Sequence, residues 1–181
     1  ERLPEESKRL LQMASVLGRT AALRILGAMW GHPEQLTPHL RELGRLEFLY
    51  KVGVDDEAVC AFKHALTQAV AYESLLAGQR ADLHAAAGRA IEQLHAGRLE
   101  DVYDSLAYHF GRTRQSGKAV DDLSRSADKA VSRHAHMEAV GALESALLRV
   151  PELAPELHDR LTLGLVLRLA NSQLSIGRFR E

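Results

Sequence analysis

Apolar residues recur along most of the chain at the three- and four-residue spacing of amphipathic helices. The first such segment follows Pro4 and two acidic residues and ends before Gly18, and the second ends at Gly31. A third begins near Leu36, with Pro38 in its first turn. The pattern therefore predicts three consecutive helices at the start of the chain.

The period changes after the third helix. Residues 48–52 and 58–62 are short runs of apolar and β-favouring residues, and 53–57 has the composition of a turn. These segments predict a two-stranded hairpin. Three helices followed by a hairpin is the order of a winged helix, and we expect the hairpin to pack on the helices because it would be marginal alone.

The segment 62–76 changes from an extended run to an amphipathic helix, with His64 at the junction. Its apolar side chains recur at helical spacing, at Phe62, Ala65, Leu66, Ala69, Val70, Tyr72 and Leu76. His64 would lie beside backbone N–H groups that have no intrahelical acceptor, which favours an anion. It either caps local backbone or meets solvent, or it contacts a phosphate, to which imidazole can donate a hydrogen bond.

Beyond residue 80 the chain carries helix signals only. Helices are predicted over 83–94 and 102–110, and a leucine-rich helix over 156–175. Between them, 117–123 and 136–143 both contain an Ala-Val step followed three residues later by leucine. Small residues let helices pack closely, so this pattern is typical of a tetratricopeptide-like solenoid, with repeats of about 34 residues.

The sequence therefore predicts a mainly α protein in two parts. A winged-helix domain with a short β-hairpin would occupy 1–77, and the start of a tetratricopeptide-like array of helical hairpins would occupy 78–181. The short connection between them favours packing over free movement. We also expect a piece of a longer protein, because 1–7 leads almost directly into a helix and 176–181 stops at the start of a helical turn.

Composition narrows the class of protein further. With 46% hydrophobic residues the chain can bury a core, and its net charge of −1 gives no general attraction to nucleic acid or anionic membranes. The single cysteine, Cys60, excludes an intrachain disulfide and suits a reducing compartment as an apolar packing residue. Without a signal peptide or a long apolar run, we expect a cytoplasmic protein without membrane contact.

No catalytic or metal-ligand spacing is present in the sequence. The histidines other than His64 are His32, His39, His84, His95, His109, His134, His136 and His158. No two of them lie four residues apart with a glutamate between them, which is the helical spacing that binds zinc. We therefore expect solvated or locally capping histidines and no metal. No serine lies in a nucleophile elbow, and the chain itself is predicted not to be an enzyme.

A winged helix raises DNA binding as an alternative. The third helix carries Arg41 and Arg45, but Glu42 lies between them and Glu47 follows. The turn at 53–57 carries three acidic residues, which DNA phosphates would repel. The charges disfavour direct nucleic-acid binding and favour use of the fold as a packing module.

The run Phe62-Lys63-His64-Ala65-Leu66, with 70–75 after it, resembles a signature that follows the nucleotide-binding domain in bacterial signalling ATPases of the STAND class. Segments 3–19, 40–50 and 83–90 also resemble these proteins. Their commonest chains look like class III adenylate/guanylate cyclases fused to an AAA-like ATPase and tetratricopeptide repeats. His64 is similar to the histidine of the Met-His-Asp motif in related NB-ARC winged helices, although Lys63 and Ala65 replace its methionine and aspartate.

The resemblance implies a non-catalytic regulatory and interaction segment of a nucleotide-switched ATPase that controls a linked cyclase. ATP or ADP and magnesium would bind an upstream domain of the same protein, and His64 would contact the ADP phosphate. The helical repeats would bind a protein partner whose identity the sequence does not give. The alternatives are the same segment in an ATPase-type transcriptional activator, or a winged helix that binds DNA itself.

Overall fold

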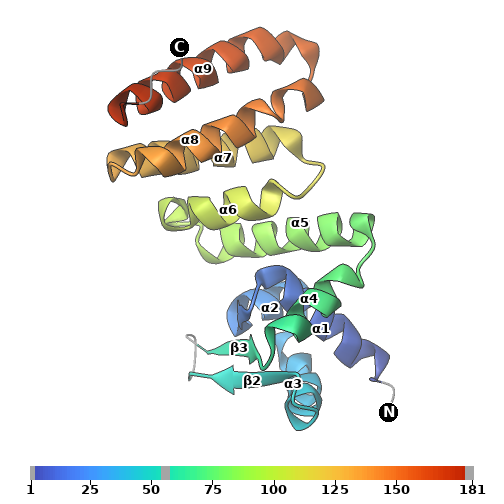
Figure 1. The fold of residues 1–181 in the computed structure, drawn as a ribbon. Coiled ribbons are helices and arrows are strands. Elements are labelled where there is room, and N and C mark those ends of the chain that lie inside the picture. The colour runs from blue at the N-terminus through green and yellow to red at the C-terminus, as the bar shows by residue number, and fades with distance from the viewer. Residues whose placement is uncertain (1–2, 54–57, 178–181) are drawn as a thin grey trace. The chain divides into compact units, whose positions relative to one another are not determined.

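The computed structural model describes residues 3–53 and 58–177. It divides into two compact units, Glu1–Leu94 and His95–Glu181, which are considered separately. The described residues form nine α-helices and one three-stranded sheet, which confirms a mainly α fold (Figure 1). None of the described helices combines the length and apolar character needed to cross a membrane.

The first unit begins with alternating helices and strands and ends with two helices. Its elements are α1 (Glu5–Leu17), β1 (Thr20–Ala22), α2 (Leu23–Trp30), a 3-10 turn (Pro33–Gln35), α3 (Leu36–Arg45), β2 (Leu49–Val52), β3 (Val59–Phe62), α4 (Ala65–Glu73) and α5 (Ala77–Leu94). The three helices and the hairpin strands predicted from the sequence are all present.

The sheet has the order β1-β3-β2, and both pairings are antiparallel. Leu49 lies opposite Phe62 in the β2–β3 pair, and Ala21 lies opposite Cys60 in the β1–β3 pair. The hairpin is therefore confirmed, whereas residues 54–57 of its predicted turn lie outside the described residues. Strand β1 was not predicted, because three residues are too few to show an alternation.

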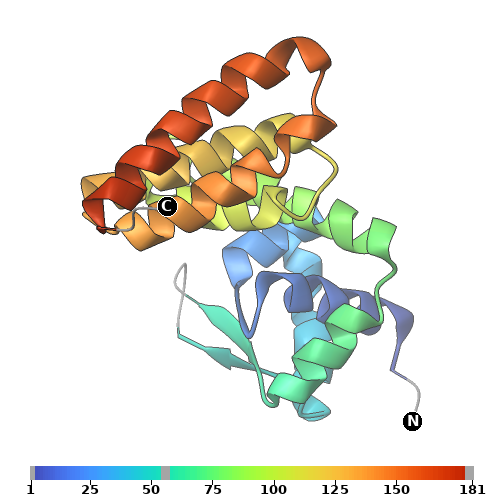
Figure 2. The same ribbon diagram turned by 45° about the horizontal axis from the view of Figure 1, so that its top comes forward.

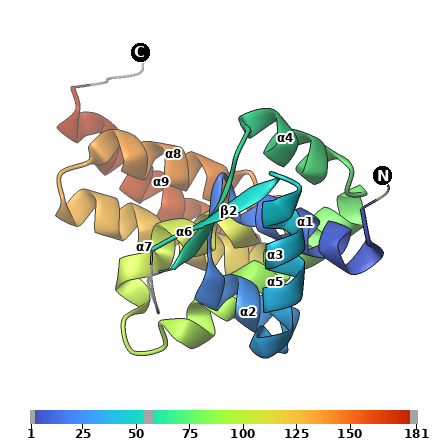
Figure 3. The same cartoon turned by 90° about the horizontal axis from the view of Figure 1, so that it is seen from below.

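One buried cluster joins the helices of the first unit to its sheet. Leu10, Leu26, Leu43, Leu49 and Phe62 are its large members, contributed by α1, α2, α3, β2 and β3 in turn. Figure 3 shows these three helices gathered beside β2. Because each helix presents one apolar stripe, the hairpin gains the packing that it lacks alone.

Helix α5 belongs to the first unit. It contacts α1 and α2, and Leu83 packs against the core of that unit. The two compact units therefore separate after Leu94, whereas the sequence pattern placed the boundary between residues 77 and 78. Periodicity shows that a helix has an apolar face but does not show which neighbour covers it.

The second unit consists of consecutive packed helices. They are α6 (Tyr103–Phe110), α7 (Ser116–Ser132), α8 (His136–Leu147) and α9 (His158–Ser175), with 3-10 turns at Leu99–Val102, Val150–Glu152 and Pro155–Leu157. Each of α6, α7 and α8 contacts the helix that follows it, and α7, α8 and α9 alternate in direction (Figures 1 and 2). Alanines 127, 130, 139 and 146 are buried in their core, where small side chains allow close approach.

Candidate functional site

His64 occupies the predicted junction between strand and helix. Strand β3 ends at Phe62, α4 begins at Ala65, and His64 is the N-cap residue with φ −128° and ψ 134°. Its carbonyl oxygen accepts hydrogen bonds from the backbone N–H of Thr67 at 3.1 Å and of Gln68 at 3.4 Å. The extended backbone at His64 thus starts the helix, as a strand entering a helix requires.

The imidazole of His64 is available to a ligand. The residue is exposed, and its side chain does not cap the helix. The imidazole makes no hydrogen bond with any described residue. Beside it, the N–H groups of Ala65 and Leu66 belong to the first helical turn and have no acceptor within the helix. An oxyanion near His64 would therefore meet up to three hydrogen-bond donors.

The charges around His64 do not complete a phosphate site. The Lys63 ammonium lies 2.7 Å from the Glu47 carboxylate, so its charge is already paired. This hydrogen bond and the Lys63 charge lower the pKa of Glu47, and the nearby His64 contributes in the same direction. A phosphate would gain the His64 imidazole and the helix N-terminus but would be repelled by Glu47.

Helix α4 carries an uncovered apolar face next to His64. Leu66 is 74% exposed and Val70 is 57% exposed, and their four-residue spacing puts them on one face of the helix. A cavity of about 340 Å³ opens beside them, lined by Lys8, Leu11, Gln12, Phe48, Leu66, Thr67, Val70, Ala71 and Ser74. We call Leu66, Val70 and this cavity the α4 face.

Hydrogen bonds hold α4 against α1. The side chain of Gln68 donates to the carbonyl oxygen of Ser15 at 2.8 Å, and that of Gln12 donates to the Ser74 hydroxyl at 2.9 Å. Ala71, which also lines the cavity, is only 7% exposed, so the side of α4 next to α1 is buried. The α4 face is therefore part of an anchored helix, and its exposure does not come from a detached segment.

Two histidines correct the expectation of solvated or capping side chains. His84 is fully buried, with its Nε2 atom 3.0 Å from the Tyr72 hydroxyl, and His109 is 4% exposed. Burial, with the neighbouring Arg112 charge, lowers the pKa of His109 to about 4. The signal was in the spacing, because His84 falls three and seven residues before the apolar Ala87 and Ile91.

Several other side chains that could react, bind a metal or bind DNA are buried, dispersed or already paired. Cys60 is 1% exposed, and burial raises the pKa of its thiol to about 11, as expected of a packing residue. Within residues 3–53 and 58–177, no three His, Cys, Asp or Glu residues are grouped so that they could hold a metal. The Arg45 guanidinium donates two hydrogen bonds to Glu42, at 2.8 and 3.0 Å, which reduces the charge that α3 offers to DNA.

In comparisons with protein-family models, curated proteins and solved structures, nothing matches this chain. Its function is therefore inferred from its residues and their geometry.

Proposed function

We propose that residues 1–181 act as a non-catalytic regulatory and interaction segment of a larger nucleotide-switched signalling ATPase. The observation that carries this proposal is the uncovered α4 face directly beside His64, whose imidazole makes no hydrogen bond with any described residue. Soluble proteins gain free energy by covering such apolar side chains, so this face suits a partner surface.

The partner in this proposal is a nucleotide-binding domain of the same protein. The domain would cover Leu66 and Val70 and bring the ADP diphosphate to His64, where the first-turn N–H groups of α4 lie. It would also supply the missing cation, since Lys63 is paired with Glu47. Closure would then depend on the nucleotide, because only a suitably placed phosphate would satisfy both the imidazole and the helix N-terminus.

The order of elements supports a winged-helix assignment for the first unit. Helix, strand, two helices and two strands follow one another, and the first strand pairs with the last. In the second unit, packed helical hairpins with an alanine-rich core support a tetratricopeptide-like array. We propose that these helices bind a protein partner. The effector in this proposal is a linked cyclase, and the alternative is that the parent protein is an ATPase-type transcriptional activator.

Calorimetric binding of residues 1–181 to the separately produced nucleotide-binding domain of the parent protein tests the proposed closure. We expect binding with ADP bound and weaker binding with a non-hydrolysable ATP analogue. Replacing Leu66 and Val70 by Glu should lower the affinity of residues 1–181 for the ADP-bound domain by at least about ten-fold, because two charges would be placed in an apolar contact. Leu148→Glu is the matched control, since Leu148 is 79% exposed in the second unit.

The two parts of the proposal can fail separately. Equal binding by wild type and the Leu66→Glu/Val70→Glu variant would show that the α4 face is not the docking surface. In the full-length protein, His64→Ala should lower ADP affinity by about ten- to a hundred-fold, the loss of one hydrogen bond to a charged group. Unchanged ADP affinity would exclude His64 as the nucleotide sensor even if docking through α4 is found.

A further inference from the structure

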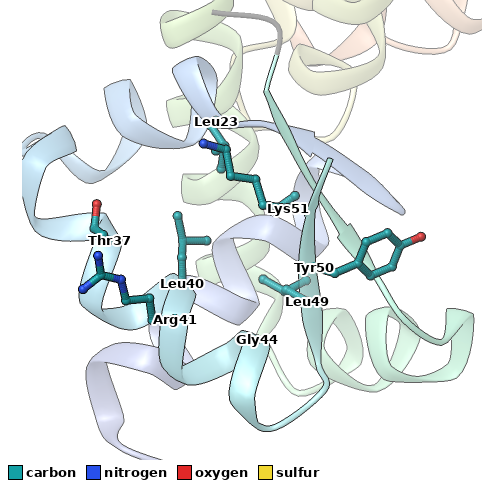
Figure 4. Close-up of a pocket in the computed structure, with 9 residues that line it drawn as sticks. Leu23, Thr37, Leu40, Arg41, Gly44, Leu49, Tyr50 and Lys51 are labelled. Carbon is teal, nitrogen blue, oxygen red and sulfur yellow. The ribbon is translucent and has the colours of Figure 1, made fainter. Parts of the chain in front are cut away.

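A second cavity lies in the first unit, between α3 and β2. It has a volume of about 560 Å³ and is lined by Leu23, Thr37, Leu40, Arg41, Gly44, Leu49, Tyr50, Lys51 and Cys60. We call it the α3–β2 groove (Figure 4). Its volume falls within the range of about 300–1,000 Å³ that is typical of sites for small molecules.

The floor of the groove is apolar. Leu40 points into it from α3 and Leu49 from β2, while Leu23 closes one end (Figure 4). Leu49 and Cys60 are 2% and 1% exposed, so the floor is continuous with the core of the unit. A ligand body lying here would gain contacts with side chains that are already held in place.

The rim of the groove is positively charged. Side chains alternate along β2, so Lys51 lies on the same side as Leu49, whereas Tyr50 points away (Figure 4). Arg41 lies on α3 one residue after Leu40. Both cations are exposed, and neither makes an ion pair or hydrogen bond with any residue of 3–53 or 58–177.

These two cations differ from the others nearby. Arg45 on the same helix is paired with Glu42, and Lys63 is paired with Glu47. Two positive charges that have no ionic partner among the described residues therefore flank an apolar cavity. A guanidinium can bind a carboxylate through two parallel hydrogen bonds, and an ammonium adds a point charge.

We propose that the α3–β2 groove binds a small amphipathic carboxylate, with its carboxylate group between Arg41 and Lys51 and its hydrocarbon body on Leu23, Leu40 and Leu49. Nucleic acid would use the two cations but would leave the apolar floor uncovered. An amphipathic carboxylate satisfies both parts of the groove. Ligand binding in the first unit would give the segment a chemical input that is separate from the α4 face.

Isothermal titration of residues 1–181 with decanoate, compared with 1-decanol below their micelle or solubility limits, tests this proposal. We expect saturable 1:1 binding of decanoate and about ten-fold or weaker binding of decanol, which lacks the charge-assisted hydrogen bonds. Arg41→Gln and Lys51→Gln should each weaken decanoate binding by about three- to ten-fold, and together they should remove the preference for decanoate over decanol.

Two further variants separate the groove from general effects on the protein. Thr37→Phe adds a ring at the exposed edge of the groove and should abolish binding of both compounds while the circular dichroism spectrum stays unchanged. Arg89→Gln, which removes an exposed cation of α5, should leave decanoate binding unaltered. Chemical shifts of Leu40 and Leu49 methyl groups should change on titration with decanoate.

Several results would overturn the proposal. Equal affinity for decanoate and decanol would exclude a role for the cations, and retained binding in Thr37→Phe would place the ligand elsewhere. Absence of decanoate binding, combined with salt-dependent binding of duplex DNA that is lost in Arg41→Gln, would assign the groove to nucleic acid instead.

Discussion

His109 shows how the surroundings of one residue link folding to pH. It lies in α6 with almost no exposed surface, and burial together with the Arg112 charge lowers its pKa from 6.5 to about 4. In the unfolded chain the imidazole regains its ordinary pKa and binds a proton below pH 6.5. Between pH 6.5 and 4 the unfolded state therefore binds more protons than the folded state, and folding becomes less favourable as the pH falls.

We expect the second unit to lose about 3 kcal/mol of unfolding free energy through His109 as the pH falls from 7 to 4, and the loss from this residue should level off below pH 4. Chemical denaturation of wild type and His109→Gln across this range measures the effect. The quantity to compare is the change in unfolding free energy with pH, since Gln also alters packing and so shifts the absolute stability. The His109 ring proton should titrate near pH 4 by NMR. Parallel pH profiles, or a midpoint near 6.5, would contradict the buried neutral imidazole.

The side chains that the sequence did not assign correctly are those whose environment comes from distant elements. The spacing of His84 with Ala87 and Ile91 indicates that it faces the core, but no local pattern marks its hydrogen bond with Tyr72, twelve residues earlier. The pairing of Lys63 with Glu47 likewise depends on where α3 ends, because Glu47 has a φ of 60° and turns the chain into β2. His64 was placed correctly at the junction because the change of period around it is local.

At the scale of elements, Gly31 ends α2 in a conformation that favours glycine. Its φ is 87° and ψ −26°, and its N–H donates to the carbonyl oxygen of Gly27 at 3.1 Å. A Cβ atom at Gly31 would meet nothing within 4 Å, so the cost of a side chain is confined to the backbone. Gly31→Ala should therefore destabilise the first unit by about 1 kcal/mol.

The matched control for Gly31→Ala is Gly78→Ala in α5, where an added Cβ also meets nothing within 4 Å but the backbone is helical. This change should be neutral or stabilise by up to about 1 kcal/mol, because alanine is the better helix former. Urea unfolding followed by fluorescence of Trp30, the single tryptophan, reports on the first unit directly. Equal effects of the two changes would contradict the left-handed helix end at Gly31.

The elements that periodicity predicts well are those with one continuous apolar face. Helices α1, α2, α3, α7 and α8 have such faces, and each was expected close to its observed position. Strand β1 was missed because it forms by pairing with β3, about forty residues later in the chain. The sequence Thr20-Ala21-Ala22 is too short to show the alternation of a strand. The exposed apolar residues of α4 were predicted to need a partner, but the sequence did not show which of them would stay uncovered.

At the scale of the molecule, the two units are stabilised in different ways. The first buries mostly larger side chains between helices and a sheet, whereas alanines make up half of the buried cluster between the helices of the second. Composition and pattern predicted this change of architecture along the chain. They did not predict that α5 joins the first unit, since its small buried residues resemble those of the later helices.

Helix α9 has apolar side chains on two opposite faces. Leu165 is 3% exposed and packs with the second core, whereas Leu163 and Leu167 are 62% and 57% exposed on the other face. A helix that is apolar on both sides suits the interior of a repeat array. When nothing else covers it, the exposed face should associate with a second copy of the chain, because burying it removes apolar surface from water.

We therefore expect the sedimentation coefficient of residues 1–181 to rise with protein concentration. Replacing Leu163 and Leu167 by Glu should weaken this self-association by at least about ten-fold, or about 1.4 kcal/mol, because carboxylates would enter the contact. Leu148→Glu replaces a leucine at the end of α8 that is even more exposed, at 79%, and should leave the association intact. If Leu66→Glu/Val70→Glu abolishes self-association and the α9 variant does not, the contact is made through α4. Concentration-independent sedimentation of the wild-type chain would show that the α9 face is stable in water and would remove this support for a helix inside a repeat array.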